Sequence, residues 1–215
     1  MMKTYKYILF DWDGCLAKTL DLWFETAKSL LIKENVFVKD KEIIKGFGDW
    51  RFAEKLGVED NEQFNRKLID IVSEKMKYVK LYKNAFECLN SLKEEGKKLA
   101  IVTTSLREYL YPALKKHNLI SFFDAIITGD DVKNHKPDPE VVYKAIELLN
   151  ANKDETLIIG DGPKDIMAGK SAGITTVSYY PKENNRFYTP AEMKSFKADY
   201  LIQDMNDLLN IVSVF

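Results

Sequence analysis

Two aspartates at the end of an apolar run are the strongest candidates for chemistry in this sequence. The run from Tyr7 to Phe10 is followed at once by Asp11-Trp12-Asp13-Gly14. This pattern predicts a buried strand that ends in a polar turn. Because residues two apart in an extended chain point the same way, Asp11 and Asp13 are expected to share one site, with Trp12 directed into packing. Two carboxylates this close repel unless a cation or a proton lies between them, which predicts a metal site.

Other side chains able to bind metal or phosphate follow later segments of the chain. Each comes directly after a short apolar run or in the loop beyond one: Thr103, Lys136, Asp161 and Asp165. A hard cation such as Mg²⁺ prefers a few carboxylate oxygens, a carbonyl and retained water. Asp11 and Asp161 are therefore candidate carboxylate ligands, and Asp165, one helical turn further on, could hold a ligating water.

Thr103 and Lys136 extend this set toward an anionic substrate. Thr103 offers a hydroxyl and a backbone N–H at a predicted helix N-terminus, an arrangement that suits an anion. Lys136 supplies a mobile positive charge for a phosphoryl group. A carboxylate nucleophile, a metal, a lysine and a hydroxyl together suit phosphoryl transfer, in which positioning and charge neutralisation do most of the catalysis.

The elements that must position these residues alternate between strand and helix from residue 81 onward. Six short apolar runs predict strands, at 7–10, 99–102, 125–127, 156–159, 174–177 and 198–202. The helical patterns between them predict an α/β fold, a Rossmann-like parallel sheet with helices on both faces. The runs are continuous rather than alternating, as expected of strands buried on both sides. In such sheets ligands bind beyond the carboxyl ends of the strands, where the candidate residues lie.

Two helix starts are predicted from capping-box patterns. Asn84 with Glu87 marks the first, and Ser105 with Glu108 marks the second. Pro112 falls inside the second helical pattern and predicts either a kink or a later start of that helix.

Residues 17–80 differ from the rest of the chain. Apolar residues recur at helical spacing from Leu20 to Leu31 and from Phe64 to Val79, and no convincing strand lies between them. The sequence therefore predicts an all-helical cap at 17–80, inserted into an α/β catalytic core formed by residues 1–16 and 81–215.

Composition argues against several other classes of protein. Of 215 residues, 46% are hydrophobic and 30% charged, as in an ordinary globular protein. The 32 basic and 33 acidic residues are dispersed, so neither a nucleic acid nor a membrane is an expected partner. No apolar stretch approaches the ~20 residues needed to span a bilayer, and no signal-peptide pattern precedes the first strand. With two distant cysteines, Cys15 and Cys88, these features predict a cytoplasmic protein; they leave the oligomeric state open.

The chain resembles the haloacid dehalogenase-like hydrolases, in the phosphatase branch that carries a helical cap after the first motif. The resemblance covers nearly the whole chain, with its motifs in the family's order. Four segments carry it: Asp11-Trp12-Asp13-Gly14, Thr103 after its strand, Lys136-Pro137-Asp138-Pro139, and Gly160-Asp161 through Asp165 to Ala172-Gly173-Ile174.

This resemblance implies roles for the four aspartates. Asp11 is the expected nucleophile, which becomes an aspartyl-phosphate. Asp13 is the expected general acid, which protonates the leaving oxygen, later activates water and contacts Mg²⁺ through its backbone carbonyl. Asp161 is expected to ligate the metal, and Asp165 to orient the metal or its water.

The resemblance also implies how a substrate would be bound. Thr103 is expected to bind the phosphate, and Lys136 to pair with both the phosphate and the nucleophile. Thr104 stands where the family often has asparagine and is a candidate substrate contact. Apart from the resemblance, Arg51 is a further candidate substrate contact, because it lies beside the Gly46-Phe47-Gly48 turn of the cap. We expect Trp23 to serve cap packing rather than substrate stacking.

The leading prediction is a Mg²⁺-dependent phosphatase that hydrolyses a small phosphorylated metabolite, a phosphomonoester, resembling phosphoglycolate phosphatases. One alternative is a phosphosugar mutase of the β-phosphoglucomutase type, although that branch carries a histidine in the first cap helix where this chain has Trp23. Dehalogenation is disfavoured by Asp13, which dehalogenases of this fold lack. A non-enzymatic, phosphoryl-accepting or binding protein is a third alternative, against which the cap argues.

Overall fold

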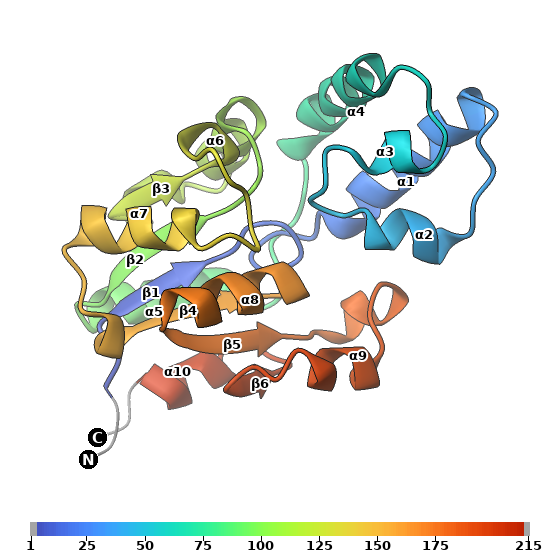
Figure 1. Cartoon of the computed structure of the whole chain (residues 1–215). Helices are drawn as coiled ribbons and strands as arrows, with labels where there is room; N and C mark the ends of the chain where they lie inside the picture. Colours follow the sequence, from blue (N-terminus) through green and yellow to red (C-terminus); the bar gives the residue numbers. More distant parts are fainter. Residues whose placement is uncertain (1–3, 213–215) are drawn as a thin grey trace.

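A single parallel sheet organises the computed structural model, which describes residues 4–212. All of its strand pairings are parallel, and the strands run in the order β3-β2-β1-β4-β5-β6 (Figure 1). The predicted α/β fold is therefore confirmed. The strands are β1 (Tyr7–Phe10), β2 (Lys98–Val102), β3 (Ala125–Ile127), β4 (Thr156–Gly160), β5 (Thr175–Tyr179) and β6 (Tyr200–Ile202).

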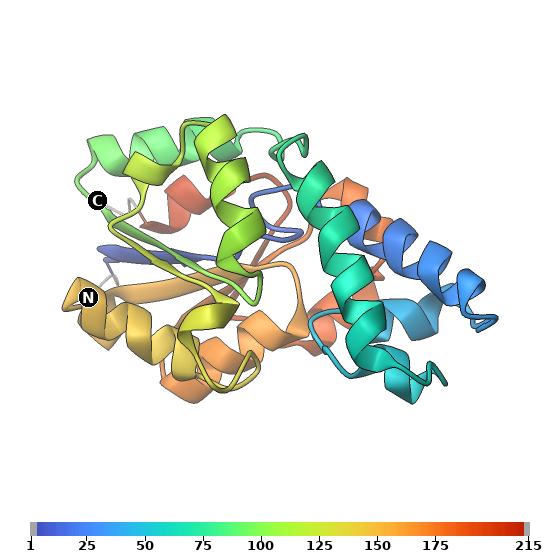
Figure 2. The same cartoon turned by 90° about the horizontal axis from the view of Figure 1, so that it is seen from above.

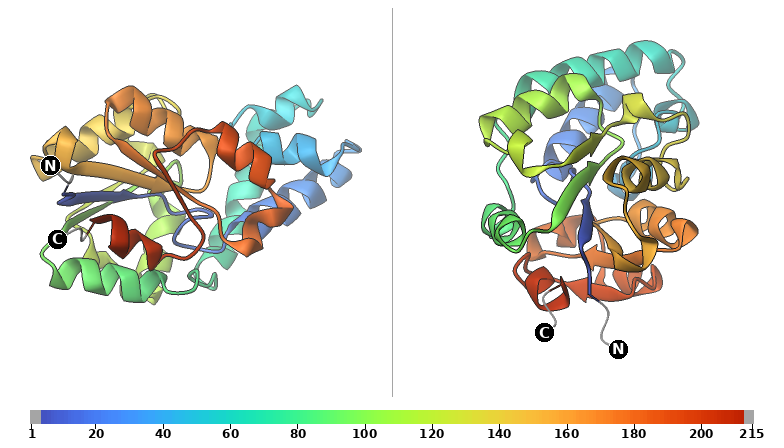
Figure 3. Two further views of the ribbon diagram at one scale, coloured as in Figure 1. Left: turned by 90° about the horizontal axis from the view of Figure 1, so that it is seen from below. Right: turned by 90° about the vertical axis from the view of Figure 1, so that its left-hand side faces the viewer.

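Helices cover both faces of this sheet (Figure 3). Successive β1 residues point to opposite sides, so Leu9 packs beneath one pair of helices while Ile8 and Phe10 pack against the other set. Burial on both faces explains why the strands read as continuous apolar runs. One face carries α7 (Glu140–Leu149) and α8 (Pro163–Ala172), and the other carries α5 (Ala85–Glu94), α6 (Arg107–Lys116) and α10 (Asp207–Val212).

Four helices follow β1 and lie beyond the carboxyl ends of the strands (Figures 1 and 2). The long helices α1 and α4 pack against each other through apolar faces, and α4 also contacts α6. We call residues 17–80 the cap, because we propose that they cover the site at the carboxyl ends of the strands. The four helices are α1 (Leu20–Lys33), α2 (Asp40–Lys45), α3 (Phe52–Lys55) and α4 (Asn61–Met76).

The chain enters and leaves the cap at the same place. The backbone N–H of Lys18 donates to the carbonyl of Lys80 at 2.8 Å, and the N–H of Tyr82 donates to that of Leu16 at 3.0 Å. The two connections therefore run side by side, directly after the turn that contains Asp13.

The remaining elements are short. Residues 181–197 contain the 3-10 turn η4 (Lys182–Arg186) and helix α9 (Pro190–Ser195). Three further 3-10 turns are η1 (Ile120–Phe122), η2 (Gly129–Asp131) and η3 (Lys153–Glu155). Among residues 4–212, no helix is both long and apolar enough to cross a membrane.

Both capping-box predictions are wrong, although both helices exist. Asn84 precedes α5 with φ +62°, and its side-chain amide donates to the carboxylate of Asp204 rather than capping the helix. Ser105 donates its hydroxyl to Asp13, and α6 begins only at Arg107. Pro112 lies inside α6, so it does not delay the helix start. In both cases a partner distant in sequence holds the side chain that local spacing had assigned to a cap.

Candidate active site

The first and last predicted acidic motifs meet at one edge of the sheet. Asp11 follows β1 and Asp161 follows β4, and these strands are neighbours. The N–H of Asp11 donates to the carbonyl of Ile159 at 2.9 Å, which extends the pairing of the two strands. The strand order changes direction at this pair, with β2 on one side of β1 and β4 on the other. A site at this point agrees with the general rule for open parallel sheets.

Three buried carboxylates gather there. Asp11, Asp161 and Asp165 each offer an oxygen, and these oxygens lie within 4.8 Å of one another. All three residues are about 5% exposed or less. Oδ2 of Asp161 is buried with no hydrogen-bond partner in the described part of the chain. A buried acceptor without a donor is costly, so this oxygen is placed to accept a cation.

Gly14 makes room for Asp161. Its φ is +77°, and a Cβ at this position would lie 2.4 Å from Oδ2 of Asp161. A side chain here would therefore both strain the backbone and displace the carboxylate. This requirement explains the glycine in the first motif.

Lys136 reaches the acid cluster from the loop before α7. Its Nζ donates to Asp11 Oδ1 at 2.7 Å, to Asp165 Oδ1 at 2.5 Å and to the carbonyl of Val102 at 3.0 Å. The lysine side chain is only 4% exposed. All three ammonium protons therefore have acceptors, and the lysine fixes two of the carboxylates relative to each other.

The cluster holds more acidic than basic groups. Burial raises the pKa of Asp11 to about 8, and it raises the pKa of Asp161 as well, with Asp165 adding to both shifts. Burial by itself would lower the pKa of Lys136, but Asp11 and Asp165 outweigh it and raise that pKa. One ammonium among three carboxylates leaves room for a divalent cation, which would favour the ionised acids.

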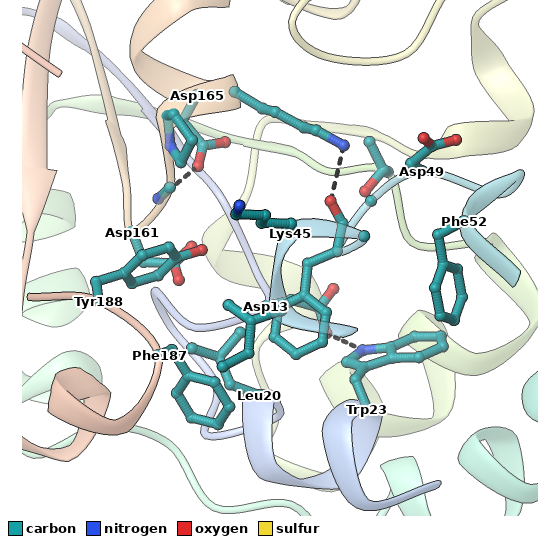
Figure 4. A pocket seen from close by; sticks show the side chains of 18 of the residues that line it. Asp13, Leu20, Trp23, Lys45, Asp49, Phe52, Asp161, Asp165, Phe187 and Tyr188 are labelled. Atoms are coloured by element: carbon teal, nitrogen blue, oxygen red, sulfur yellow. Dashed lines mark hydrogen bonds between the residues drawn. The ribbon is translucent and has the colours of Figure 1, made fainter. Parts of the chain in front are cut away.

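The carboxylate of Asp13 takes a different direction from that of Asp11. It is not part of the three-acid cluster found among residues 4–212. Trp23 Nε1–H donates to its Oδ1 at 2.8 Å (Figure 4). The Ser105 hydroxyl donates to its Oδ2. The side chain of Asp13 therefore accepts hydrogen bonds from Trp23 and Ser105, and it lies beside the three candidate metal ligands.

Thr103 is less available than its motif suggested. It is buried, its N–H donates to the Ile127 carbonyl at 3.0 Å, and its hydroxyl oxygen accepts from the Ser105 N–H at 3.0 Å. The prediction of a free backbone N–H at a helix N-terminus is wrong, because this N–H extends the bonding between β2 and β3. Thr104, the next residue, lines the cavity described below.

A cavity of about 400 Å³ opens onto these residues between the sheet edge and the cap. At one end lie Asp11, Asp13, Lys136 and the other two acids. Trp23, Phe52, Phe187 and Tyr188 form part of its wall (Figure 4). Four more aromatic residues line it: Phe47, Trp50, Tyr109 and Phe196. Lys41, Lys45 and Lys164 also line it.

Arg51 is not among the residues that line this cavity. Its side chain is 72% exposed and pairs with Glu54 at 3.3 Å. Trp23 and Ser105, by contrast, contact Asp13 although the sequence assigned them to packing and to a helix cap. One signal pointed to Trp23: an indole N–H needs an acceptor when the ring is partly buried.

The family model for haloacid dehalogenase-like hydrolases matches residues 8–179. The chain therefore belongs to this family, and the resemblance seen in the motifs is confirmed. The matched region contains the acid cluster, Lys136 and Asp13.

Similar proteins include phosphatases. The pyrophosphatase PpaX of Halalkalibacterium halodurans is 35% identical over 219 residues, which cover 96% of each chain. A solved structure from Bacteroides fragilis, described as haloacid dehalogenase-like, has a TM-score of 0.85 at 27% identity and covers 95% of this chain and 100% of its own. CbbY from Rhodobacter sphaeroides, solved with phosphate, has a TM-score of 0.81 at 19% identity and covers 98% of this chain and 100% of its own, a likeness of fold alone.

Proposed function

We propose that this protein is a Mg²⁺-dependent phosphatase that hydrolyses a small phosphomonoester through an aspartyl-phosphate on Asp11. One observation carries the proposal: Asp11, fixed by Lys136 inside a buried acid cluster, lies two residues from Asp13 at the end of a cavity. A nucleophile, a cation site and an acid are thus within reach of one small molecule.

The donor set suits Mg²⁺. Asp11 and Asp161 would hold it through carboxylate oxygens, Asp165 through an oxygen or a water, and Asp13 through its backbone carbonyl. The unpartnered Oδ2 of Asp161 and the excess of carboxylates over ammonium groups support this assignment. When bound, the ion would neutralise charge on the phosphoryl group.

The residues of the chain would then divide the chemistry. A carboxylate oxygen of Asp11 attacks phosphorus while the bond to the leaving oxygen breaks, and Asp13 gives its proton to that oxygen. In the second half Asp13 takes a proton from water as the water oxygen bonds phosphorus and the Asp11–phosphorus bond breaks. Lys136 holds Asp11 in the attacking position, and Thr103 and Thr104 are the proposed phosphate contacts.

The cavity favours a leaving group with an apolar part. A volume of about 400 Å³ walled by aromatic rings exceeds what an inorganic diphosphate fills, and aromatic walls offer it few partners. Inorganic pyrophosphate is the second candidate substrate, because a pyrophosphatase is 35% identical over almost the whole chain and four lysines, Lys136 among them, line the cavity. The mutase alternative has less support, because the indole of Trp23 is already bonded to Asp13.

A panel assay tests the proposal. Phosphate release is measured from p-nitrophenyl phosphate, a set of small phosphomonoesters and pyrophosphate, with Mg²⁺ and with a chelator. We expect Mg²⁺-dependent turnover that Asp11→Asn abolishes, with the highest kcat/KM on an organic monoester. A phosphosugar that is isomerised instead would favour the mutase, and a folded protein that turns over no substrate in an Asp11-dependent way would refute the enzyme.

A further inference from the structure

Two donors from different parts of the fold hold the side chain of Asp13. The indole N–H of Trp23 comes from α1 in the cap and meets Oδ1 at 2.8 Å. The hydroxyl of Ser105 comes from the segment after β2 and meets Oδ2. The carboxylate thus lies between a donor of the cap, seen in Figure 4, and a donor of the sheet edge.

We infer that Trp23 is a positioning residue for proton transfer by Asp13. The inference rests on the proposed function, in which Asp13 is the general acid and base. A carboxyl group transfers a proton efficiently only when its oxygen is held within hydrogen-bond reach of the leaving oxygen. A rigid donor on one oxygen fixes where the other oxygen points.

The chemistry of the two donors distinguishes the two oxygens. An indole N–H can only donate, so Oδ1 remains an acceptor in both protonation states of Asp13. A serine hydroxyl can donate or accept, so Ser105 tolerates Oδ2 with or without a proton. The transferable proton is therefore assigned to Oδ2. It moves to the leaving oxygen as Asp11 bonds phosphorus and the bond from phosphorus to that oxygen breaks. A proton of water replaces it when the water oxygen bonds phosphorus and the Asp11–phosphorus bond breaks.

Aromatic neighbours fix the indole itself. Trp23 packs edge-to-face against Trp50 of the cap, with ring centroids 6.3 Å apart, and against Tyr109 of α6, at 5.6 Å. Its ring is thus clamped between the cap and the helix that follows Ser105. Displacing α1 from the sheet edge would remove the donor from Oδ1, so the acid is aligned only while the cap is seated.

A series of phosphate esters tests this role. Trp23→Phe keeps an aromatic ring and removes the N–H. We expect kcat/KM to fall about 10- to 100-fold for alkyl phosphates, whose leaving oxygen needs a proton, and clearly less for p-nitrophenyl phosphate, whose leaving group departs as an anion. The slope of log kcat/KM against leaving-group pKa becomes steeper. Equal losses on all esters, or no loss on any, would overturn the inference.

Two further variants separate positioning from packing. Leu30→Ala removes apolar packing about two turns beyond Trp23 on the same helix, at a buried position away from the cavity, and it should leave the leaving-group slope unchanged. In an Asp13→Asn background, adding Trp23→Phe should cause no further loss, because the acid it positions is gone. An additional loss there would show that Trp23 acts otherwise. Wild-type protein that turned over no ester would instead refute the proposed function.

Discussion

The sheet edge and the cap surround the same cavity with opposite kinds of side chains. At the edge, charged groups are buried and bonded to one another, as Lys136 is at 4% side-chain exposure. In the cap, the walls are aromatic and the cations are exposed, as Arg51 is at 72%. A surface ion pair such as Arg51 with Glu54 contributes little to the free energy of folding. The free energy of a buried charge, by contrast, depends on each of its partners.

This contrast suggests a division of labour. Buried, mutually bonded groups keep a fixed geometry, which phosphoryl transfer requires. An apolar wall excludes water and selects by shape, but it does not direct charge. Substitutions at the edge should therefore change turnover. Substitutions in the cap should change which substrates bind, except at Trp23, which contacts Asp13. The following predictions test that contrast, from the largest expected effect to the smallest.

Replacing Lys136 should be the most damaging. In Lys136→Met the carboxylates of Asp11 and Asp165 lose their shared ammonium, and we expect kcat to fall by about 10²- to 10³-fold. Unfolding by denaturant without Mg²⁺ should show a loss of about 3–5 kcal/mol, which Mg²⁺ should partly restore because it supplies the missing charge. Lys133→Met, at an exposed position of the same loop, is the matched control. Similar kinetics in both variants would contradict a catalytic role for Lys136.

Replacing Gly14 should weaken metal binding. The added Cβ of Gly14→Ala displaces Asp161, and we expect the concentration of Mg²⁺ needed for half-maximal activity to rise about 10- to 100-fold. Gly96→Ala is a matched control, since Gly96 has a similar φ of +74° but nothing within 4 Å of its added Cβ. If both variants need the same amount of Mg²⁺, backbone strain alone accounts for the effect.

Lys164 offers a test of how the cap is seated. Lys164 lies in α8 of the α/β core, and its ammonium group donates to the carbonyl of Phe47 in the cap at 2.7 Å. Lys164→Met removes one hydrogen bond to a charged group, and we expect KM for the preferred substrate to rise about 5- to 30-fold with a smaller change in kcat. Lys170→Met, which removes a bond from the same helix to the carbonyl of Phe196 outside the cap, should raise KM less. A fall in kcat alone would place Lys164 with the catalytic groups instead.

The smallest effect is expected at Arg51. Because its side chain is exposed and outside the cavity, Arg51→Ala should change kcat/KM by less than about twofold on every ester. Lys45→Met, which alters a cation that lines the cavity, should change the ranking of substrates more. A large loss of kcat/KM on some esters but not on others in Arg51→Ala would show that Arg51 is a specificity residue.

The sequence by itself determined the sheet and the approximate position of the chemistry. Apolar runs buried on both faces mark strands wherever they occur, and parallel strands bring their carboxyl ends to one edge. Asp11, Asp161 and Lys136 were therefore predictable as neighbours, although they are as far as 150 positions apart in the chain. Backbone rules of this kind need no knowledge of side-chain packing.

Only the tertiary structure decided which donor each polar side chain meets. Asn84 and Ser105 had correct spacing for helix caps, yet one binds Asp204 and the other binds Asp13. Trp23 had the spacing of a packing residue and also bonds Asp13, while Arg51 points to solvent. A local pattern fixes a side chain's place on its helix, but its partner depends on how helices distant in sequence come together.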